Sequence, residues 1–239
     1  STWFNEEAEV FIRQTLAEHG VNFHMGNRAK SVNKEGDRIT IHLSDGGVVD
    51  ADILINTTGV KSRISFLDGS GVKLNHGVVV DRRMRTNLDG IFAAGDVAAA
   101  PDFFSDKPGM NVTVASAVSQ GRVAGAGMAG VQAEYQGEIP VAALNFFGNA
   151  AFSIGLNVPS VDTYKTVKQV DSSGKRFKKL VFSGNILIGG MFVNEKVDPG
   201  IVAWLIKKHL DTSPYFGALF DRTQPLSDPW LASLKIAKP

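Results

Sequence analysis

The sequence predicts an α/β protein whose last part changes to an α+β unit with an antiparallel sheet. Two apolar runs, at 52–56 and 91–94, each end close to a glycine, as strands buried on both faces of a parallel sheet do. Further along, 163–193 consists of strand-like runs joined by short polar turns, which is typical of an antiparallel meander. The 25 glycines show no period, and they suit a fold with many tight turns.

The first quarter of the chain predicts a helix, a hairpin and two further strands. Asn5 is the expected N-cap of a helix over 5–19, and Gly20 follows its end. The other elements expected here are a short strand at 21–24, hairpin strands at 28–33 and 38–43, and the buried strand at 52–56.

The remaining elements follow in order, and the last helix is the most sharply marked. Asp198-Pro199 is expected to cap it, and Lys207 and Lys208 lie near its C-terminal end, where the helix dipole favours cations. The preceding elements are strands at 77–81 and 91–94, a small-residue helix over 112–128, a linker at 131–140, and strands at 163–170, 177–183 and 186–193.

The composition excludes several classes of protein. The 239 residues include 25 Lys and Arg against 24 Asp and Glu, so there is no basic excess for nucleic acid. The chain has no cysteine, which excludes a disulfide scaffold, a thiolate metal site and a redox thiol within it. No signal peptide is recognisable, and no apolar run approaches the ~20 residues that cross a bilayer. We therefore expect a cytoplasmic protein without membrane contact, and an N-terminus that is processed or truncated.

The segment 86–97 carries the most specific pattern. It reads TNLDGIFAAGDV, so an apolar strand leads directly into Gly95 and Asp96. Open α/β sheets bind ligands at the carboxyl ends of their strands, and a glycine there lets the backbone approach the ligand. A carboxylate in that place accepts hydrogen bonds from the vicinal hydroxyls of a sugar or polyol. An ordinary Gly-Asp turn is the alternative interpretation, but it does not account for the whole segment.

This segment resembles the second flavin motif of the FAD-dependent pyridine nucleotide–disulfide oxidoreductase family. The family pattern is Thr, a short turn, four small or apolar residues, and Gly-Asp. The resemblance implies that Asp96 contacts the ribityl chain of FAD, with Gly95 and Val97 beside it. From about residue 140, the chain resembles NADH oxidases and the flavin portion of nitrite reductases.

Two further stretches support the resemblance. Residues 112–122, VTVASAVSQGR, are similar to the helix after the flavin Asp, whose N-terminal amides face the pyrimidine edge of the flavin. The resemblance assigns this place to Val112 and Thr113, where the partial positive charge of a helix N-terminus favours an anionic reduced flavin. Residues 52–59, DILINTTG, resemble the strand returning from the nucleotide domain, so Gly59 would border the nicotinamide. The family often continues with Pro-Asn two residues later, and this chain departs with VKSR.

By this resemblance we expect three domains in a partial FAD/NAD(P) flavoprotein fold with two dinucleotide-binding domains. Residues 1–59 would be the second half of an NAD(P)H-binding domain, and 60–135 the returning part of the FAD-binding domain. Residues 140–239 would be an interface domain through which the protein forms a homodimer. The cofactor implied is FAD, with NAD(P)H as substrate.

Several family features are missing from the sequence. The two glycine-rich βαβ loops for FAD pyrophosphate and NAD(P)H do not occur, so we expect both upstream of Ser1. A G-x-G-x-x-G at 125–130 closes a helical segment instead of opening one, so we interpret it as a closely packed helix end. None of the five histidines precedes a proline, as the base of the disulfide reductases does, and we assign no catalytic residue. No motif or clustered spacing of metal-ligating residues in the sequence predicts a metal site.

Two functions are compatible with these patterns. The first is the C-terminal portion of an FAD-dependent NAD(P)H oxidoreductase, which passes electrons to an unidentified acceptor and has a redox partner subunit. Without a phosphate-binding loop, this chain by itself is expected to be inactive. The alternative is a non-catalytic module that dimerises or scaffolds a multi-subunit redox complex. Glycine-rich loops encoded upstream of Ser1 would favour the enzyme, and a start codon at Ser1 would favour the module.

Overall fold

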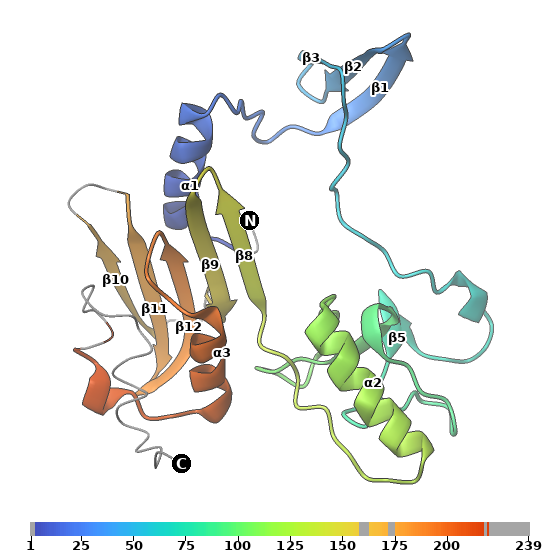
Figure 1. The fold of residues 1–239 in the computed structure, drawn as a ribbon. Helices are drawn as coiled ribbons and strands as arrows, with labels where there is room; N and C mark the ends of the chain where they lie inside the picture. The colour runs from blue at the N-terminus through green and yellow to red at the C-terminus, as the bar shows by residue number, and fades with distance from the viewer. Residues whose placement is uncertain (1–2, 158–162, 172–174, 218, 220–239) are drawn as a thin grey trace. The chain divides into compact units, whose positions relative to one another are not determined.

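The computed structural model describes residues 3–157, 163–171, 175–217 and 219 (Figure 1). Contacts divide the chain into two compact units. The smaller unit is Gly20–Lys61, and the larger one consists of Ser1–His19 together with Ser62–Pro239. The strands of the described residues form three sheets, one in the smaller unit and two in the larger.

The smaller unit is an antiparallel sheet in the order β1-β2-β3. Its strands are β1 (Ala29–Glu35), β2 (Arg38–Leu43) and β3 (Val48–Ala51). The predicted hairpin is confirmed, and Gly36 takes a φ of 60° in its turn, a conformation that glycine adopts without strain. The strand predicted at 21–24 is wrong, because these residues pair with no described strand and so lack the hydrogen bonds that define one.

The predicted buried strand at 52–56 is also wrong. These residues form no strand, and the side chains of Ile53 and Ile55 are 77% and 78% exposed. A strand buried on both faces needs paired neighbours and cover over both faces, and no described residue of this unit supplies either.

The first part of the larger unit is a small sheet with one helix. The sheet has the order β4-β5-β6-β7, and only β5 and β6 are parallel. Helix α2 (Val114–Met128) contributes Val123 and Ala124 to a core shared with Val78 and Ala98 of the sheet. The strands are β4 (Leu74–Asn75), β5 (Gly77–Val79), β6 (Ala98–Pro101) and β7 (Pro108–Gly109), and two 3-10 turns are η1 (Ser65–Leu67) and η2 (Gly95–Val97).

The buried parallel strand lies after the Gly-Asp pair instead of before it, which corrects the strand predicted at 91–94. That segment forms only an isolated bridge between Phe92 and Arg85. The chain turns at Gly95, and β6 then pairs with β5. Gly77 makes this pairing close, because a Cβ there would lie 2.7 Å from the carbonyl oxygen of Val97.

The second part of the larger unit is a five-stranded antiparallel sheet in the order β10-β11-β12-β9-β8. Its elements are β8 (Val141–Phe146), β9 (Asn149–Gly155), β10 (Lys165–Val170), β11 (Phe177–Ser183), β12 (Ile186–Val193), α3 (Pro199–Lys208) and η3 (Ser213–Tyr215). The meander and the Asp198 cap of α3 are confirmed, although the turn at 172–174 lies outside the described residues. The hairpin β8–β9 was not predicted, because its Ala- and Asn-containing strands have low β propensity.

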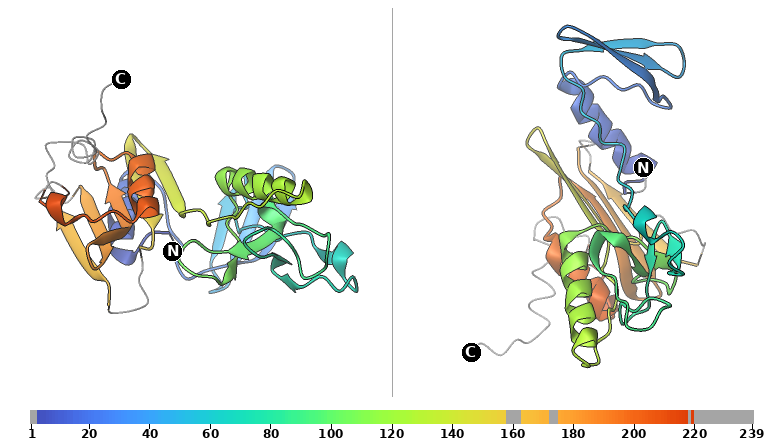
Figure 2. Two further views of the ribbon diagram at one scale, coloured as in Figure 1. Left: turned by 90° about the horizontal axis from the view of Figure 1, so that it is seen from below. Right: turned by 90° about the vertical axis from the view of Figure 1, so that its right-hand side faces the viewer.

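Two helices cover opposite faces of this sheet (Figures 1 and 2). Successive side chains of a strand point to opposite faces, so Leu180 of β11 packs with α3 while Phe177 packs with α1 (Glu6–Glu18). Helix α1 buries Ala8 and Ile12 on its face of the sheet. The sheet core is therefore closed on both sides within the described residues.

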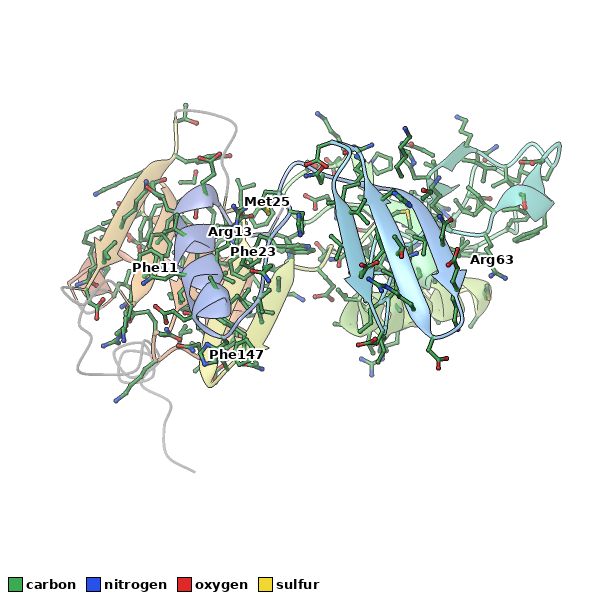
Figure 3. The ribbon with its side chains drawn as sticks, turned by 90° about the horizontal axis from the view of Figure 1, so that it is seen from above. Phe11, Arg13, Phe23, Met25, Arg63 and Phe147 are labelled. Carbon is green, nitrogen blue, oxygen red and sulfur yellow. The ribbon has the colours of Figure 1, made fainter. Side chains whose placement is uncertain are left out.

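Helix α1 is held on the sheet by apolar and polar contacts. Phe11 extends over the strands (Figure 3), and its ring centroid lies 5.5 Å from that of Phe177. Lys168 of β10 pairs with Glu7 at 2.6 Å, and this hydrogen bond lowers the pKa of Glu7. The contact division thus does not follow the boundary expected at residue 59, and the three-domain division stays a prediction.

Candidate functional site

An open groove in the larger unit brings together three of the residues predicted from the sequence. Turn η2 forms one side of it and the N-terminal end of α2 forms the other, and its volume is about 500 Å³. The lining residues are Asp96, Val112, Thr113, Val114, Ala117 and Val118.

The main chain on either side of Asp96 is fixed by hydrogen bonds. Gly95 takes a φ of 79°, and its N–H donates to Gln120 Oε1 at 2.8 Å. On the other side, the Ser62 hydroxyl donates to the carbonyl oxygen of Asp96 at 2.7 Å. The turn that carries Asp96 is therefore held from two elements far apart in the sequence.

The carboxylate of Asp96 is free to bind a ligand. The residue is exposed at the groove, and no described group forms a hydrogen bond with its side chain. An ionised carboxylate accepts hydrogen bonds through both oxygens, so it can hold two neighbouring hydroxyls. This donor and acceptor chemistry fits the polyol chain that the sequence resemblance implies.

Of the two amides predicted to face the flavin, that of Thr113 is already engaged and that of Val112 has no described acceptor. Thr113 is the N-cap, and its hydroxyl oxygen accepts from Ser116 N–H at 3.2 Å. The N–H of Thr113 itself donates to the Asn111 carbonyl at 2.9 Å, so it is not available to a ligand. The amides of Val114 and Ala115 have no described acceptor, as expected for the first residues of a helix. The Thr-Val-Ala-Ser run could have located this cap in the sequence.

The other predicted contact residues lie differently. Val97 is half-buried in η2, where its carbonyl oxygen lies close to Gly77, and its predicted place beside the flavin stays a prediction. Gly59 belongs to the smaller unit and has a φ of 99°. Its predicted position beside a nicotinamide stays a prediction.

The segment 125–130 occupies the C-terminal end of α2, which confirms its interpretation as a closely packed helix end. A Cβ at Gly127 would lie 2.8 Å from the ring of Phe92. Gly130 follows the helix with a φ of 76°. No helix begins in this segment, so it offers no N-terminal amides to a phosphate.

The loop before the site is stabilised by Asp81, whose carboxylate accepts hydrogen bonds from the main-chain N–H groups of Arg83 and Arg85 and from the Arg85 guanidinium. Burial raises the pKa of Asp81, but these hydrogen bonds outweigh it, so the pKa lies below its ordinary value.

The described residues contain no cluster of three His, Cys, Asp or Glu side chains that could hold a metal ion. In the same part of the chain, no helix has the length and apolar character to span a membrane.

Comparison with known families decides the identity of the chain. Residues 2–121 match the family described as pyridine nucleotide-disulphide oxidoreductase. The chain belongs to the pyridine nucleotide-disulphide oxidoreductase family. Residues 140–210 match the C-terminal domain of rubredoxin NAD+ reductase. The resemblance to this family is thus confirmed, together with the predicted fold class.

Two relatives illustrate the range of the family. The epsilon subunit of the NADH-dependent phenylglyoxylate dehydrogenase of Aromatoleum evansii is 34% identical over 218 residues, which are 90% of this chain and 51% of that protein. Rubredoxin-NAD(+) reductase of Alcanivorax borkumensis is 34% identical over 94 residues, 39% of this chain and 25% of that protein. The chain spans about half or less of the length of these relatives.

Solved structures share the fold. An NAD-dependent persulfide reductase from A. fulgidus superposes with a TM-score of 0.78 at 22% identity, over 99% of this chain and 48% of that one. A water-forming NADH oxidase from Lactobacillus brevis, bound to NADH, gives 0.78 at 20% identity, over 99% of this chain and 58% of that one.

Proposed function

We propose that this chain is the C-terminal portion of an FAD-dependent NAD(P)H oxidoreductase that passes electrons from a nicotinamide through FAD to an acceptor. The observation that carries the proposal is the groove that the free Asp96 carboxylate shares with the N-terminal end of α2, where the amides of Val114 and Ala115 have no described acceptor. The names of the relatives support an acceptor that is another protein or subunit, since they include a dehydrogenase subunit and a rubredoxin reductase.

In this proposal several residues at or beside the groove have separate roles. Asp96 accepts hydrogen bonds from the ribityl hydroxyls, and Gly95 leaves space for that chain. The amides of Val114 and Ala115 donate to the polar edge of the ring, where the helix N-terminus stabilises negative charge. Bound FAD supplies the ability to take up a hydride and release electrons, which no side chain has. Gly59 is proposed to border the nicotinamide.

Spectroscopy of the full-length protein tests this function. We expect the purified protein to show flavin absorbance that NADH or NADPH bleaches without oxygen. The 239-residue chain alone should give no saturable NADH oxidation, because it has no glycine-rich loop that opens a helix. A full-length protein without flavin or nicotinamide oxidation would instead support a scaffolding module. Turnover of NADH by the isolated chain would contradict the expectation that this chain alone is inactive.

We further propose that the protein is a cytoplasmic homodimer joined through 140–239. The apolar side chains that suggested this in the sequence, including Leu187, Met191 and Phe192, are buried beneath α1 and α3 and need no partner. The proposal now depends on edge strand β8, where Val141 and Leu144 are exposed beside unpaired backbone groups.

Light scattering of the full-length protein measures the dimer directly. The parent should have the mass of two chains, and Leu144→Lys should shift it to one, because a lysine on an edge strand opposes pairing. Val170→Lys, on the opposite edge of the sheet, is the matched control and should remain dimeric. A parent that is monomeric at all concentrations would contradict the dimer.

A further inference from the structure

Three buried polar side chains lie near the groove, and none of them is among its lining residues. Ser116 and Gln120 come from α2, and Tyr135 comes from the segment that follows this helix. Their exposed fractions are 0%, 2% and 4%. Polar groups are costly to bury unless they are hydrogen-bonded, so their arrangement needs an explanation beyond filling space.

The three side chains form one continuous chain of hydrogen bonds. Gln120 Oε1 accepts from the N–H of Gly95 at 2.8 Å, and Gln120 Nε2 donates to the Ser116 hydroxyl at 3.0 Å. The hydroxyls of Ser116 and Tyr135 are 2.9 Å apart. Both ends of the Gln120 amide are therefore used, one on the turn of the site and one on its own helix.

The far end of this chain is anchored as firmly as the near end. The main-chain N–H of Tyr135 donates to the Arg82 carbonyl at 2.7 Å, and the Arg82 guanidinium donates back to the Tyr135 carbonyl at 3.1 Å. Ser116 also lies in the first turn of α2, where its N–H binds the Thr113 cap. The network thus connects η2 to the first turn of α2, and these are the two walls of the groove.

We propose that Gln120 is a positioning residue for the flavin, and this inference depends on the function proposed above. By holding the N–H of Gly95, it sets the distance between Asp96 and the free amides of Val114 and Ala115. An apolar residue of similar size would fill the same space but would leave the half-buried Gly95 N–H without its acceptor. The two walls would then lose their fixed separation.

The test compares three variants of the full-length holoprotein by their FAD dissociation constants. Gln120→Met preserves the volume and removes the acceptor, so FAD should bind about tenfold more weakly. Gln120→Glu should restore affinity to within about threefold of the parent, because its carboxylate can accept from both Gly95 N–H and the Ser116 hydroxyl. Ser119→Ala is the matched control, since Ser119 bonds Glu138 outside the network, and it should bind FAD as the parent does.

Thermal unfolding of the apoprotein separates positioning from a purely structural role. All dissociation constants are measured well below the unfolding range, where a merely structural change leaves the folded protein's affinity unaltered. If Gln120→Met does not fold, Tyr135→Phe takes its place, with an expected loss of about two- to threefold in affinity. Parent-like affinity in the folded Gln120→Met variant, or in Tyr135→Phe where that replaces it, would overturn the inference while leaving the proposed function intact. A parent that binds no FAD would overturn both.

Discussion

Replacing Asp96 with alanine in the full-length protein should weaken FAD retention about ten- to a hundredfold. The carboxylate lines the groove and has no hydrogen-bond partner among the described residues, so a ligand can use both of its oxygens. A hydrogen bond to a charged group contributes about 1.5–3 kcal/mol, and 1.4 kcal/mol is one decade in affinity. Because the side chain bonds no described group, the stability of the apoprotein should be unchanged.

Asp89 provides the matched control for this substitution. It lies exposed in the turn before the site and does not line the groove, so Asp89→Ala should retain FAD like the parent. A flavin-release titration on both variants measures the difference. Equal retention by Asp96→Ala and the parent, or equal loss in both variants, would contradict the assignment of Asp96 as the flavin contact of the 86–97 motif.

Local chemistry made much of the fold predictable from the sequence. Asn5, Thr113 and Asp198 each cap a helix with a side-chain oxygen, and two of these three caps were expected. The hairpin β1–β2 and the meander β10–β12 could be recognised because a strand alternates within a few residues and its turn chemistry is local. The Gly95-Asp96 pair could be recognised for the same reason, although the strand predicted directly before it does not form.

Features that depend on distant partners could not be predicted in this way. The runs at 52–56 and 91–94 are apolar enough for buried strands, but a strand forms only where another strand accepts its hydrogen bonds. The groove also depends on distant partners, because Gln120 bonds Gly95 and Ser62 bonds Asp96, and both come from far along the chain. Hydrophobic patterning indicates which face of an element is buried, but it does not indicate which other element packs against that face.

Helix α1 shows this most clearly, and its packing leads to the second large expected effect. The helix itself was predicted, but its contact with the sheet of 140–239 was not. Ile12 is 7% exposed there, whereas Val10 on the same helix is 61% exposed. Ile12→Ala should therefore lower the free energy of unfolding by about 2–4 kcal/mol, because it removes buried methyl groups and leaves a cavity.

Val10→Ala is the control for Ile12→Ala, and it should change the free energy of unfolding by less than about 0.5 kcal/mol, as exposed substitutions do. Denaturant titration gives both values, and amide hydrogen exchange locates the effect. Because α1 packs on Met191 and Val193, Ile12→Ala should speed exchange in β12. If exchange rises within Gly20–Lys61 and not in β12, helix α1 packs with the rest of 1–59, as the boundary expected at residue 59 implies.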